Sequence, residues 1–164
     1  RCMPWDIDPW MELNNGRTLT LYDLGRIPMA VRMGLTDVLK REGWGFTVAG
    51  SSVRYRRRIK VMQKFTEVSR MVGWDDRFVY MEQSMWSRGD CCNQILLRVA
   101  VVGGGSGRKG IVPPVEIIRA MGQDIVSPPL PEWVQAWIAA EGTRPWPPVL
   151  PPVPAAERTR DLPA

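Results

Sequence analysis

"GRTLTLYDLGRIPMAVRMGLTDVLKREG", residues 16–43, decides the fold class, because this stretch predicts a long helix around which the rest of the chain must pack. Its apolar residues recur at spacings of 3, 4, 3 and 4, which places them on one helical face: Leu21, Leu24, Pro28, Val31 and Leu35. Pro28 predicts a kink or a division, since proline lacks the N–H that would bond one turn back. Gly34 precedes a second short helical piece, and Gly43 ends it. We expect a long kinked helix whose stripe packs on something flat.

Downstream of this helix, from residue 46 to about 102, runs of strand-forming residues alternate with turn signals. Four strands fit, over residues 46–59, 64–74, 77–87 and 93–102, and the short turns between the last three predict an antiparallel meander. No helix-length segment separates these strands, which argues against a parallel dinucleotide-binding sheet. With a short strand near residues 1–7, this order predicts an α+β hot-dog fold, an antiparallel sheet of about five strands wrapped around the long kinked helix.

The C-terminal third differs from this core. Two short helices are predicted over residues 114–122 and 130–142, each begun by proline at a tolerated position and ended by glycine. Seven of the 15 prolines then fall in the last 22 residues, which predicts an extended, polyproline-like tail. The expected organisation is a hot-dog domain over 1–112, a C-terminal helical extension over 113–142 and a Pro-rich tail over 143–164.

Composition bounds the class of protein. The 164 residues suit one compact domain, and 45% hydrophobic with 24% charged residues excludes a wholly disordered chain. No apolar run approaches the roughly 20 residues needed to span a bilayer, and no signal-peptide pattern opens the chain. A soluble, cytoplasmic protein with no membrane partner is therefore expected.

The chain contains no histidine, which removes Ser-His-Asp and Cys-His catalysis and the common zinc sites. Its three cysteines, Cys2, Cys91 and Cys92, argue against a disulfide framework and are expected to be thiols. Any catalysis must then rest on carboxylates, backbone dipoles, amides, lysine or arginine. No metal and no cofactor is expected.

The net charge of +5 is concentrated in one place. The run RYRRRIK, residues 54–60, carries five of the 22 positive residues, so 17 positive residues face 17 negative ones elsewhere. That distribution indicates a local anion site rather than a broad nucleic-acid face, and no nucleic-acid partner is expected. If the run is a strand, Arg54, Arg56 and Arg58 share one face and Arg57 lies on the other.

The stretch WDIDPWMELNNGR, residues 5–17, sets three acids ahead of two asparagines and a glycine, a pattern typical of a turn and helix cap. It also resembles the N-terminal motif of hot-dog acyl-CoA thioesterases of the 4-hydroxybenzoyl-CoA thioesterase type. That motif is an aspartate, a histidine four residues on, an asparagine pair and a tyrosine. Asp8 takes the aspartate position and Asn14 and Asn15 those of the asparagines. Glu12 stands at the histidine position, and Thr18 stands at the tyrosine position.

The resemblance covers about residues 1–105, since the helix and strands follow in the family's order. It implies hydrolysis of a thioester between an acyl group and coenzyme A or a carrier protein, with Asp8 as nucleophile or as base for a water. Coenzyme A enters as part of the substrate. A thioester carbonyl at the helix N-terminus would meet unpaired backbone donors and the positive end of the helix dipole. The resemblance further implies a homodimer or homotetramer whose sites use both subunits.

Four residues around Asp8 are expected to line this site. Asn14 and Asn15 are explained as helix caps that could also face the substrate. Gly16 allows close backbone approach and is a candidate oxyanion donor. Glu12 adds a second negative charge near Asp8, which would raise the pKa of one carboxyl if both are buried.

The basic run is expected to contact the phosphates of coenzyme A, with Arg57 and Arg58 preferred because they lie near the predicted strand end. The alternative function is a non-catalytic hot-dog protein that binds acyl thioesters or acts as an assembly module. It is motivated by Glu12, by Thr18 and by the lack of histidine.

Two other acids are interpreted as ion-pair partners rather than catalysts. Asp6 is expected to be a solvent-exposed partner of Arg1 or Arg17. Asp23, with Arg26 three residues later, is expected to form a surface or interface ion pair.

Overall fold

The long helical segment folds into two helices in the computed structural model, which describes residues 1–103 and 110–149. These are α1 (Asn15–Arg32) and α2 (Leu35–Glu42). Helix α1 continues through Pro28, so of the predicted kink or division the division does not occur. The break falls at Gly34, whose φ of +75° glycine adopts without strain, and Gly43 ends α2 as predicted.

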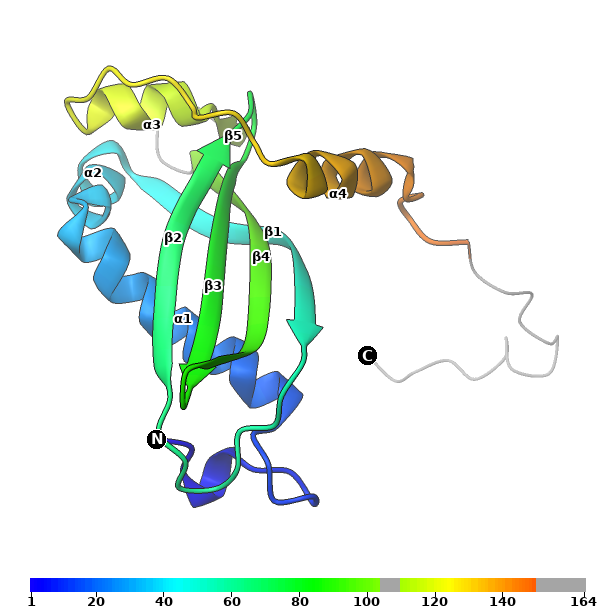
Figure 1. Ribbon diagram of the computed structural model, residues 1–164. Coiled ribbons are helices and arrows are strands. Elements are labelled where there is room, and N and C mark those ends of the chain that lie inside the picture. The colour runs from blue at the N-terminus through cyan, green and yellow to red at the C-terminus, as the bar shows by residue number, and fades with distance from the viewer. Residues whose placement is uncertain (104–109, 150–164) are drawn as a thin grey trace, which may run out of the picture. The chain divides into compact units, whose positions relative to one another are not determined.

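The sheet contains the predicted antiparallel meander (Figure 1). Its strands are β1 (Trp44–Tyr55), β2 (Thr66–Trp74), β3 (Val79–Ser87) and β4 (Asp90–Gly103), in the order β1-β4-β3-β2, and β5 (Gly110–Val112) pairs with β4. The meander is β2-β3-β4, which runs inward from the β2 edge. Helix α1 crosses one face of this sheet (Figure 1). The α+β hot-dog fold is therefore confirmed.

The N-terminal segment differs from the prediction. Instead of a strand over residues 1–7, Pro4–Asp6 forms a short 3-10 helix, η1, and the fifth strand of the sheet is β5. The physical reason is local. Proline suits the first helical position, and the Asp6 carboxylate accepts the Met3 N–H at 3.0 Å, which caps the turn.

Helix α1 buries a different face from the one its periodicity suggested. Leu24 and Val31, members of the predicted stripe, are 58% and 55% exposed. The face turned to the sheet carries Thr18, Tyr22 and Arg26, which are all buried. Both the exposed and the buried face of α1 carry apolar residues. The polar atoms of the buried face have hydrogen-bond partners in the sheet. The expected packing of the leucine stripe is therefore wrong for Leu24 and Val31, whereas Leu21 packs against the main core and Leu35 against the second cluster.

The main core lies between α1 and the sheet. Most of its fully buried side chains come from α1, β3 and β4, among them Tyr22, Met85, Ile95, Leu97 and Val99. A second, smaller cluster holds α3 (Pro114–Ala120) against the sheet through Val101, Val112 and Ile117.

The chain forms two compact units, Arg1–Leu130 and Pro131–Ala164. Helix α3 belongs to the first unit, whereas α4 (Glu132–Thr143) belongs to the second. The predicted Pro-rich tail lies mostly outside the described residues, which end at 149. None of the helices in the described ranges is long and apolar enough to cross a membrane.

Candidate functional site

Residues 6–14 fold back on themselves just before α1. The Asp8 N–H donates to the Glu12 carbonyl at 2.8 Å, and the Asn14 N–H donates to the Asp6 carbonyl at 2.9 Å. The Asp8 carboxylate accepts the N–H groups of Trp10, at 2.9 Å, and Glu12, at 3.4 Å. Asp8 therefore lies near the tip of this hairpin and orders its turn.

Asn14 is the N-cap of α1, as predicted. Its Oδ1 accepts the N–H of Gly16 at 2.8 Å and the N–H of Arg17 at 3.2 Å. Asn15 is the first helical residue rather than a cap, and its carbonyl accepts the Tyr55 hydroxyl at 3.2 Å. An oxyanion that used the Gly16 N–H would have to take the place of the Asn14 amide oxygen.

A polar pocket of about 200 Å³ lies beside the first turn of α1. Its lining comes from the hairpin, α1, the end of β1 and β4: Glu12, Leu13, Asn15, Thr18, Tyr55, Arg56, Arg57, Arg58, Ile59 and Asn93. Of the predicted site residues, the structure brings together Glu12, Asn15, Arg57 and Arg58. The other three, Asp8, Asn14 and Gly16, are not among the described residues that line this pocket.

The glutamate of the polar pocket has a cationic partner. The Glu12 carboxylate lies 2.9 Å from Arg58 Nε. Toward Asp8, Glu12 presents its backbone N–H and carbonyl instead of its carboxylate. The charge next to the Glu12 carboxylate is therefore the guanidinium of Arg58.

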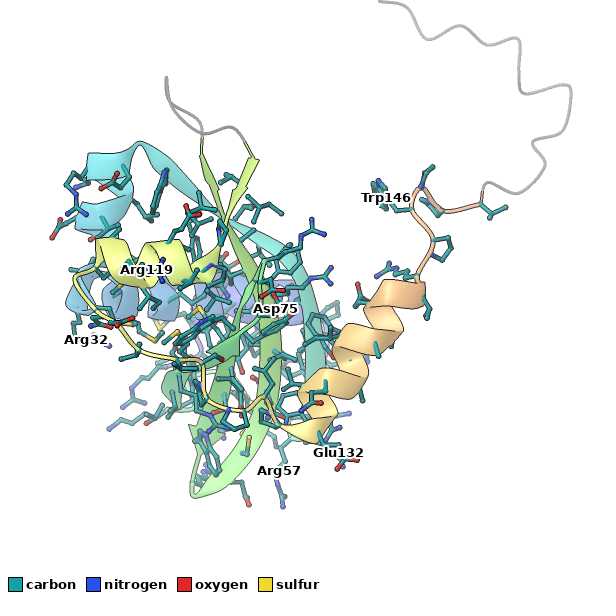
Figure 2. All side chains as sticks on the ribbon, turned by 90° about the horizontal axis from the view of Figure 1, so that it is seen from above. Arg32, Arg57, Asp75, Arg119, Glu132 and Trp146 are labelled. Carbon is teal, nitrogen blue, oxygen red and sulfur yellow. The ribbon has the colours of Figure 1, made fainter. Side chains whose placement is uncertain are left out.

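The basic run begins in strand β1 with Arg54 and Tyr55 and continues as a loop from Arg56. Strand β1 ends at Tyr55, and the N–H groups of Arg56 and Arg57 both donate to the Cys92 carbonyl at 2.9 Å. The predicted alternation of faces is therefore wrong, because Arg56, Arg57 and Arg58 line the same pocket. Arg57, labelled in Figure 2, is 62% exposed and lies 3.4 Å from Asp90.

A second hollow of about 770 Å³ is lined by the same three arginines and by two further cations, Lys60 and Arg88. Sequence reasoning did not single out Arg88. The available signal was its place in the turn SRGD between two strands, because such a turn brings its residues to one end of the sheet. The cluster of cationic side chains therefore extends beyond the run 54–60, and Asp90 lines the same hollow.

Asp6 is buried, which corrects the expected exposure. Its side chain is 3% exposed and accepts Arg17 Nε at 2.9 Å and Arg17 Nη2 at 2.7 Å. Arg17 is one of the two predicted partners, so the pairing itself is confirmed. The turn of η1 carries the carboxylate inward, toward the first turn of α1.

A buried polar cluster, formed by Tyr22, Arg26, Glu67, Ser69 and Gln83, lies beneath the middle of α1. The Gln83 amide nitrogen donates to Glu67 Oε1 and Ser69 Oγ, both at 2.8 Å, and to the Tyr22 carbonyl at 2.9 Å. Arg26 Nη1 donates to Gln83 Oε1 at 2.9 Å. Sequence reasoning missed this cluster, although Glu67 and Gln83 are polar residues inside predicted strands.

Two details complete the polar cluster. Arg26 forms the predicted ion pair with Asp23, which joins an Arg26 side chain that is only 9% exposed to an Asp23 side chain that is 58% exposed. The Glu67 carboxylate lies directly against Gly25, where any Cβ would overlap it. Glycine at this position therefore lets the carboxylate reach the underside of the helix.

Burial raises the pKa of Glu67 from 4.5 to about 7, an effect that Arg26 and the hydrogen bonds from Gln83 and Ser69 partly offset. The folded state therefore holds this proton more tightly than the unfolded state. The contribution of this proton to the free energy of unfolding is fully present below the unfolded pKa of 4.5. It is lost as the pH rises through about 7.

Glu67→Gln is expected to remove this loss, because an amide of similar size stays neutral. At about pH 8 its free energy of unfolding should exceed that of the wild type by on the order of 2 kcal/mol. Urea unfolding between about pH 4 and pH 8 measures the difference, with the exposed Asp76→Asn as control. Equal pH dependence in Glu67→Gln and wild type would contradict the assignment.

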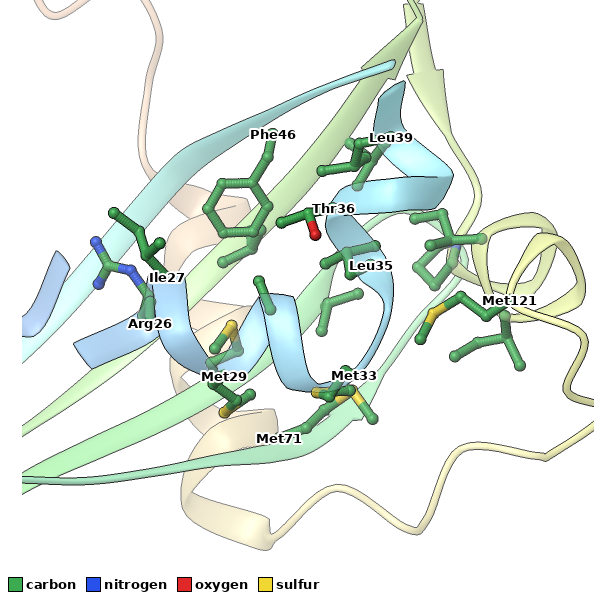
Figure 3. Close-up of a pocket in the computed structure, with 18 of the residues that line it drawn as sticks. Arg26, Ile27, Met29, Met33, Leu35, Thr36, Leu39, Phe46, Met71 and Met121 are labelled. Carbon is green, nitrogen blue, oxygen red and sulfur yellow. The ribbon is translucent and has the colours of Figure 1, made fainter. Parts of the chain in front are cut away.

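An apolar cavity of about 400 Å³ lies between α1, α2, the sheet and α3 (Figure 3). Five of the nine methionines line it: Met29, Met33, Met71, Met81 and Met121. Most of the other lining residues are aliphatic, and Asp23 and Arg26 join it to the polar cluster. Sequence reasoning did not find this cavity, because its lining comes from segments far apart in the chain.

The sequence has relatives. Residues 2–138 match the family described as the thioesterase-like superfamily. Protein THEM6 of Xenopus laevis is 30% identical over 138 residues, which are 83% of this chain and 63% of the frog protein. The chain covers 47% of the Drosophila melanogaster protein of the same name, so it spans less than two thirds of these relatives.

Solved structures share the fold. The probable thioesterase YbaW of Escherichia coli matches with a TM-score of 0.65 and 14% identity, covering 73% of this chain and 90% of that one. A thioesterase from Thermus thermophilus, solved with coenzyme A and zinc, matches with a TM-score of 0.54 and 24% identity, covering 74% and 90%. At these identities the likeness establishes the hot-dog fold.

Proposed function

The chain belongs to the thioesterase-like superfamily, and from this premise we propose that it hydrolyses a thioester between an acyl group and coenzyme A or an acyl carrier. The observation that carries the proposal is the polar pocket. It gathers the Glu12 carboxylate and three arginines beside the first turn of α1. The pocket thus offers a helix N-terminus for the oxyanion and arginines suited to phosphate, and the reaction further requires a carboxylate that can take a proton or attack.

The chemistry needs no histidine. In the proposed reaction a carboxylate takes a proton from water, whose oxygen forms a bond to the thioester carbonyl carbon. The resulting oxyanion collapses, the C–S bond breaks, and the sulfur leaves as the protonated thiol. The N-terminal donors of α1 stabilise the oxyanion, and Gly16 N–H is the donor we assign, in exchange for Asn14.

We assign the reacting carboxylate to Asp8, as base or as nucleophile. Its resemblance to the family aspartate supports this assignment. Because Asp8 lies near the hairpin tip, outside the lining of its own chain's polar pocket, it would serve the pocket of a partner subunit. In this arrangement Glu12 holds Arg58, and the chain that carries the polar pocket supplies the arginines and the Gly16 N–H.

A homodimer is part of the proposal. In the described part of the chain, β1 has β4 on one side and ends the sheet on the other, so its backbone groups can pair with a second copy. The exposed stripe of α1, formed by Leu24, Ile27 and Val31, is 55–59% exposed and could be covered by the same contact. Light scattering reports the mass, and a monomer at working concentration would rule this arrangement out.

Arg57 and Arg58 are proposed to contact the phosphates of coenzyme A, since a guanidinium fork matches phosphate oxygens. The test measures thiol release from acyl-CoA and from acyl-pantetheine, which lacks the nucleotide phosphates. Arg57→Ala should raise KM for acyl-CoA by about five- to tenfold and leave acyl-pantetheine unchanged. Arg54→Ala, on the same chain segment but outside both basic hollows, is the matched control.

Turnover above the uncatalysed rate by the wild type supports hydrolysis, and no thiol release from any acyl-CoA overturns it. One observation favours a second candidate, a non-catalytic protein that binds acyl thioesters. The Asp8 carboxylate orders a turn and the Glu12 carboxylate pairs with Arg58, so both acids have structural roles. Acyl-CoA binding without thiol release would favour this second candidate.

A further inference from the structure

We propose that the apolar cavity holds the tail of a long, unbranched aliphatic acyl chain, and that α3, through Met121, sets the chain length that fits. This inference rests on the proposed function, because the chain is delivered as a thioester. It assigns a substrate class and a specificity-determining residue. Both assignments are argued from the residues that line the cavity, from its position along α1 and from the helix α3 that lines one end of it.

The lining suits a flexible hydrocarbon. At about 400 Å³ the cavity has the size of a small-molecule site, and 16 of its 19 lining residues are apolar. Methionine adapts its shape to an irregular partner, so a wall with five methionines fits a chain that adopts many conformations. A planar acyl group with polar substituents would find only Asp23, Arg26 and Thr36 as polar side chains.

The position of the cavity requires a long chain. Strand β1 runs from the cavity at one end to the N-terminus of α1 at the other. The Tyr55 hydroxyl meets the Asn15 carbonyl near the helix N-terminus, whereas Phe46, at the other end of β1, lines the cavity. Asp23, the first α1 residue of the lining, follows Gly16 by seven residues, or about 10 Å of helix. An acetyl group or a single aromatic ring held at Gly16 would therefore not enter the cavity.

Helix α3 closes the cavity opposite α1. Pro114, Ile117, Ile118 and Met121 line that end, and Ile117 shares a buried cluster with Val101 of β4. Met121 extends from the end of α3 toward the cavity (Figure 3). It is partly buried and packs against the second hydrophobic cluster, so a larger or smaller side chain there changes the size of this end of the cavity. Helix α3 follows the predicted 1–112 domain in sequence. We therefore assign the selection of chain length to α3 rather than to the hot-dog core.

The experiment compares saturated acyl chains from hexanoyl to stearoyl, both as acyl-CoA substrates and as nonhydrolysable thioether analogues. For the wild type, each added methylene that enters the cavity should raise affinity by roughly fourfold until the cavity is full. Met121→Trp should lower kcat/KM for the longest chain at least about tenfold and leave hexanoyl-CoA unchanged. Met121→Ala should move the optimum to longer chains. Val115→Trp, on the exposed side of α3, is the matched control.

The outcomes separate this inference from the proposed function. Hydrolysis with an identical chain-length profile in wild type and both Met121 variants overturns the inference and leaves hydrolysis standing. A shifted binding profile for the thioether analogues without thiol release supports the cavity assignment and overturns hydrolysis. Binding of free fatty acids but not of the analogues overturns delivery as a thioester. Thermal unfolding checks each variant, and Met121→Ala keeps the test decisive if the tryptophan variant does not fold.

Discussion

Replacing Asp6 with alanine is expected to lower the free energy of unfolding by about 3 kcal/mol. The carboxylate is nearly inaccessible and accepts three hydrogen bonds, two from Arg17 and one from the Met3 N–H. Its removal leaves these donors unpaired, and an unpaired buried donor costs more than the bond contributed. The expected loss is at the low end for a buried pair because Arg17 is 39% exposed and keeps some hydration. Urea unfolding measures the change.

Two variants control this measurement. Asp8→Ala removes a carboxylate from the same hairpin whose bonds lie within its own turn, so about 1 kcal/mol is expected. The double variant Asp6→Ala with Arg17→Ala should cost less than the two single changes summed, because the second change removes a group already left unpaired. If Asp6→Ala costs no more than Asp8→Ala, the buried pair contributes no more than an ordinary turn.

The fold could be predicted because its signals are local. Turn residues between short strands predicted the meander, and glycines marked the helix break at Gly34 and the end of α2. The buried face of α1 could not be predicted, because its leucine stripe and its Tyr22–Arg26 face are both plausible from periodicity. The decision depends on Gln83, which lies in a strand more than 50 residues later and bonds both Arg26 and the Tyr22 carbonyl, and on Glu67, whose carboxylate accepts from Gln83.

The candidate site also has features that local sequence signals predict and features that depend on long-range contacts. Asn14 as helix cap follows from residue type and position, and the structure confirms it. The pairing of Glu12 with Arg58 joins residues 46 positions apart, and no local pattern indicates it. The placement of Arg56–Arg58 in one pocket depends on β1 ending at Tyr55, where two successive N–H groups turn to the Cys92 carbonyl. Long-range contacts of this kind need the folded chain.

Asp8→Asn is expected to produce the largest effect on catalysis, a fall in kcat of at least about 100-fold with little change in KM. An asparagine keeps the turn hydrogen bonds of Asp8 but can neither accept a proton from water nor attack the carbonyl. Thiol release under single-turnover conditions measures the chemical step. Asp76→Asn, an exposed acid of the β2–β3 turn, controls for the loss of one negative charge.

Glu12→Gln separates the two acids of the motif. If Glu12 acts only by holding Arg58, its amide should raise KM for acyl-CoA by about tenfold and lower kcat only slightly. The reverse order, with kcat lost in Glu12→Gln and kept in Asp8→Asn, would transfer the catalytic role to Glu12.

A mixing experiment tests whether Asp8 serves the partner's pocket. When Asp8→Asn and Glu12→Gln chains exchange subunits, half of the sites in a mixed dimer combine a wild-type Asp8 with a wild-type Glu12, provided that the two residues come from different chains. At acyl-CoA concentrations well below KM, where the raised KM of Glu12→Gln limits its rate, activity should then rise above that of either parent. If both residues of a site come from one chain, every site in the mixed dimer carries one defect and no gain appears. Because Asp8 lies outside the polar pocket of its own chain, we expect the gain.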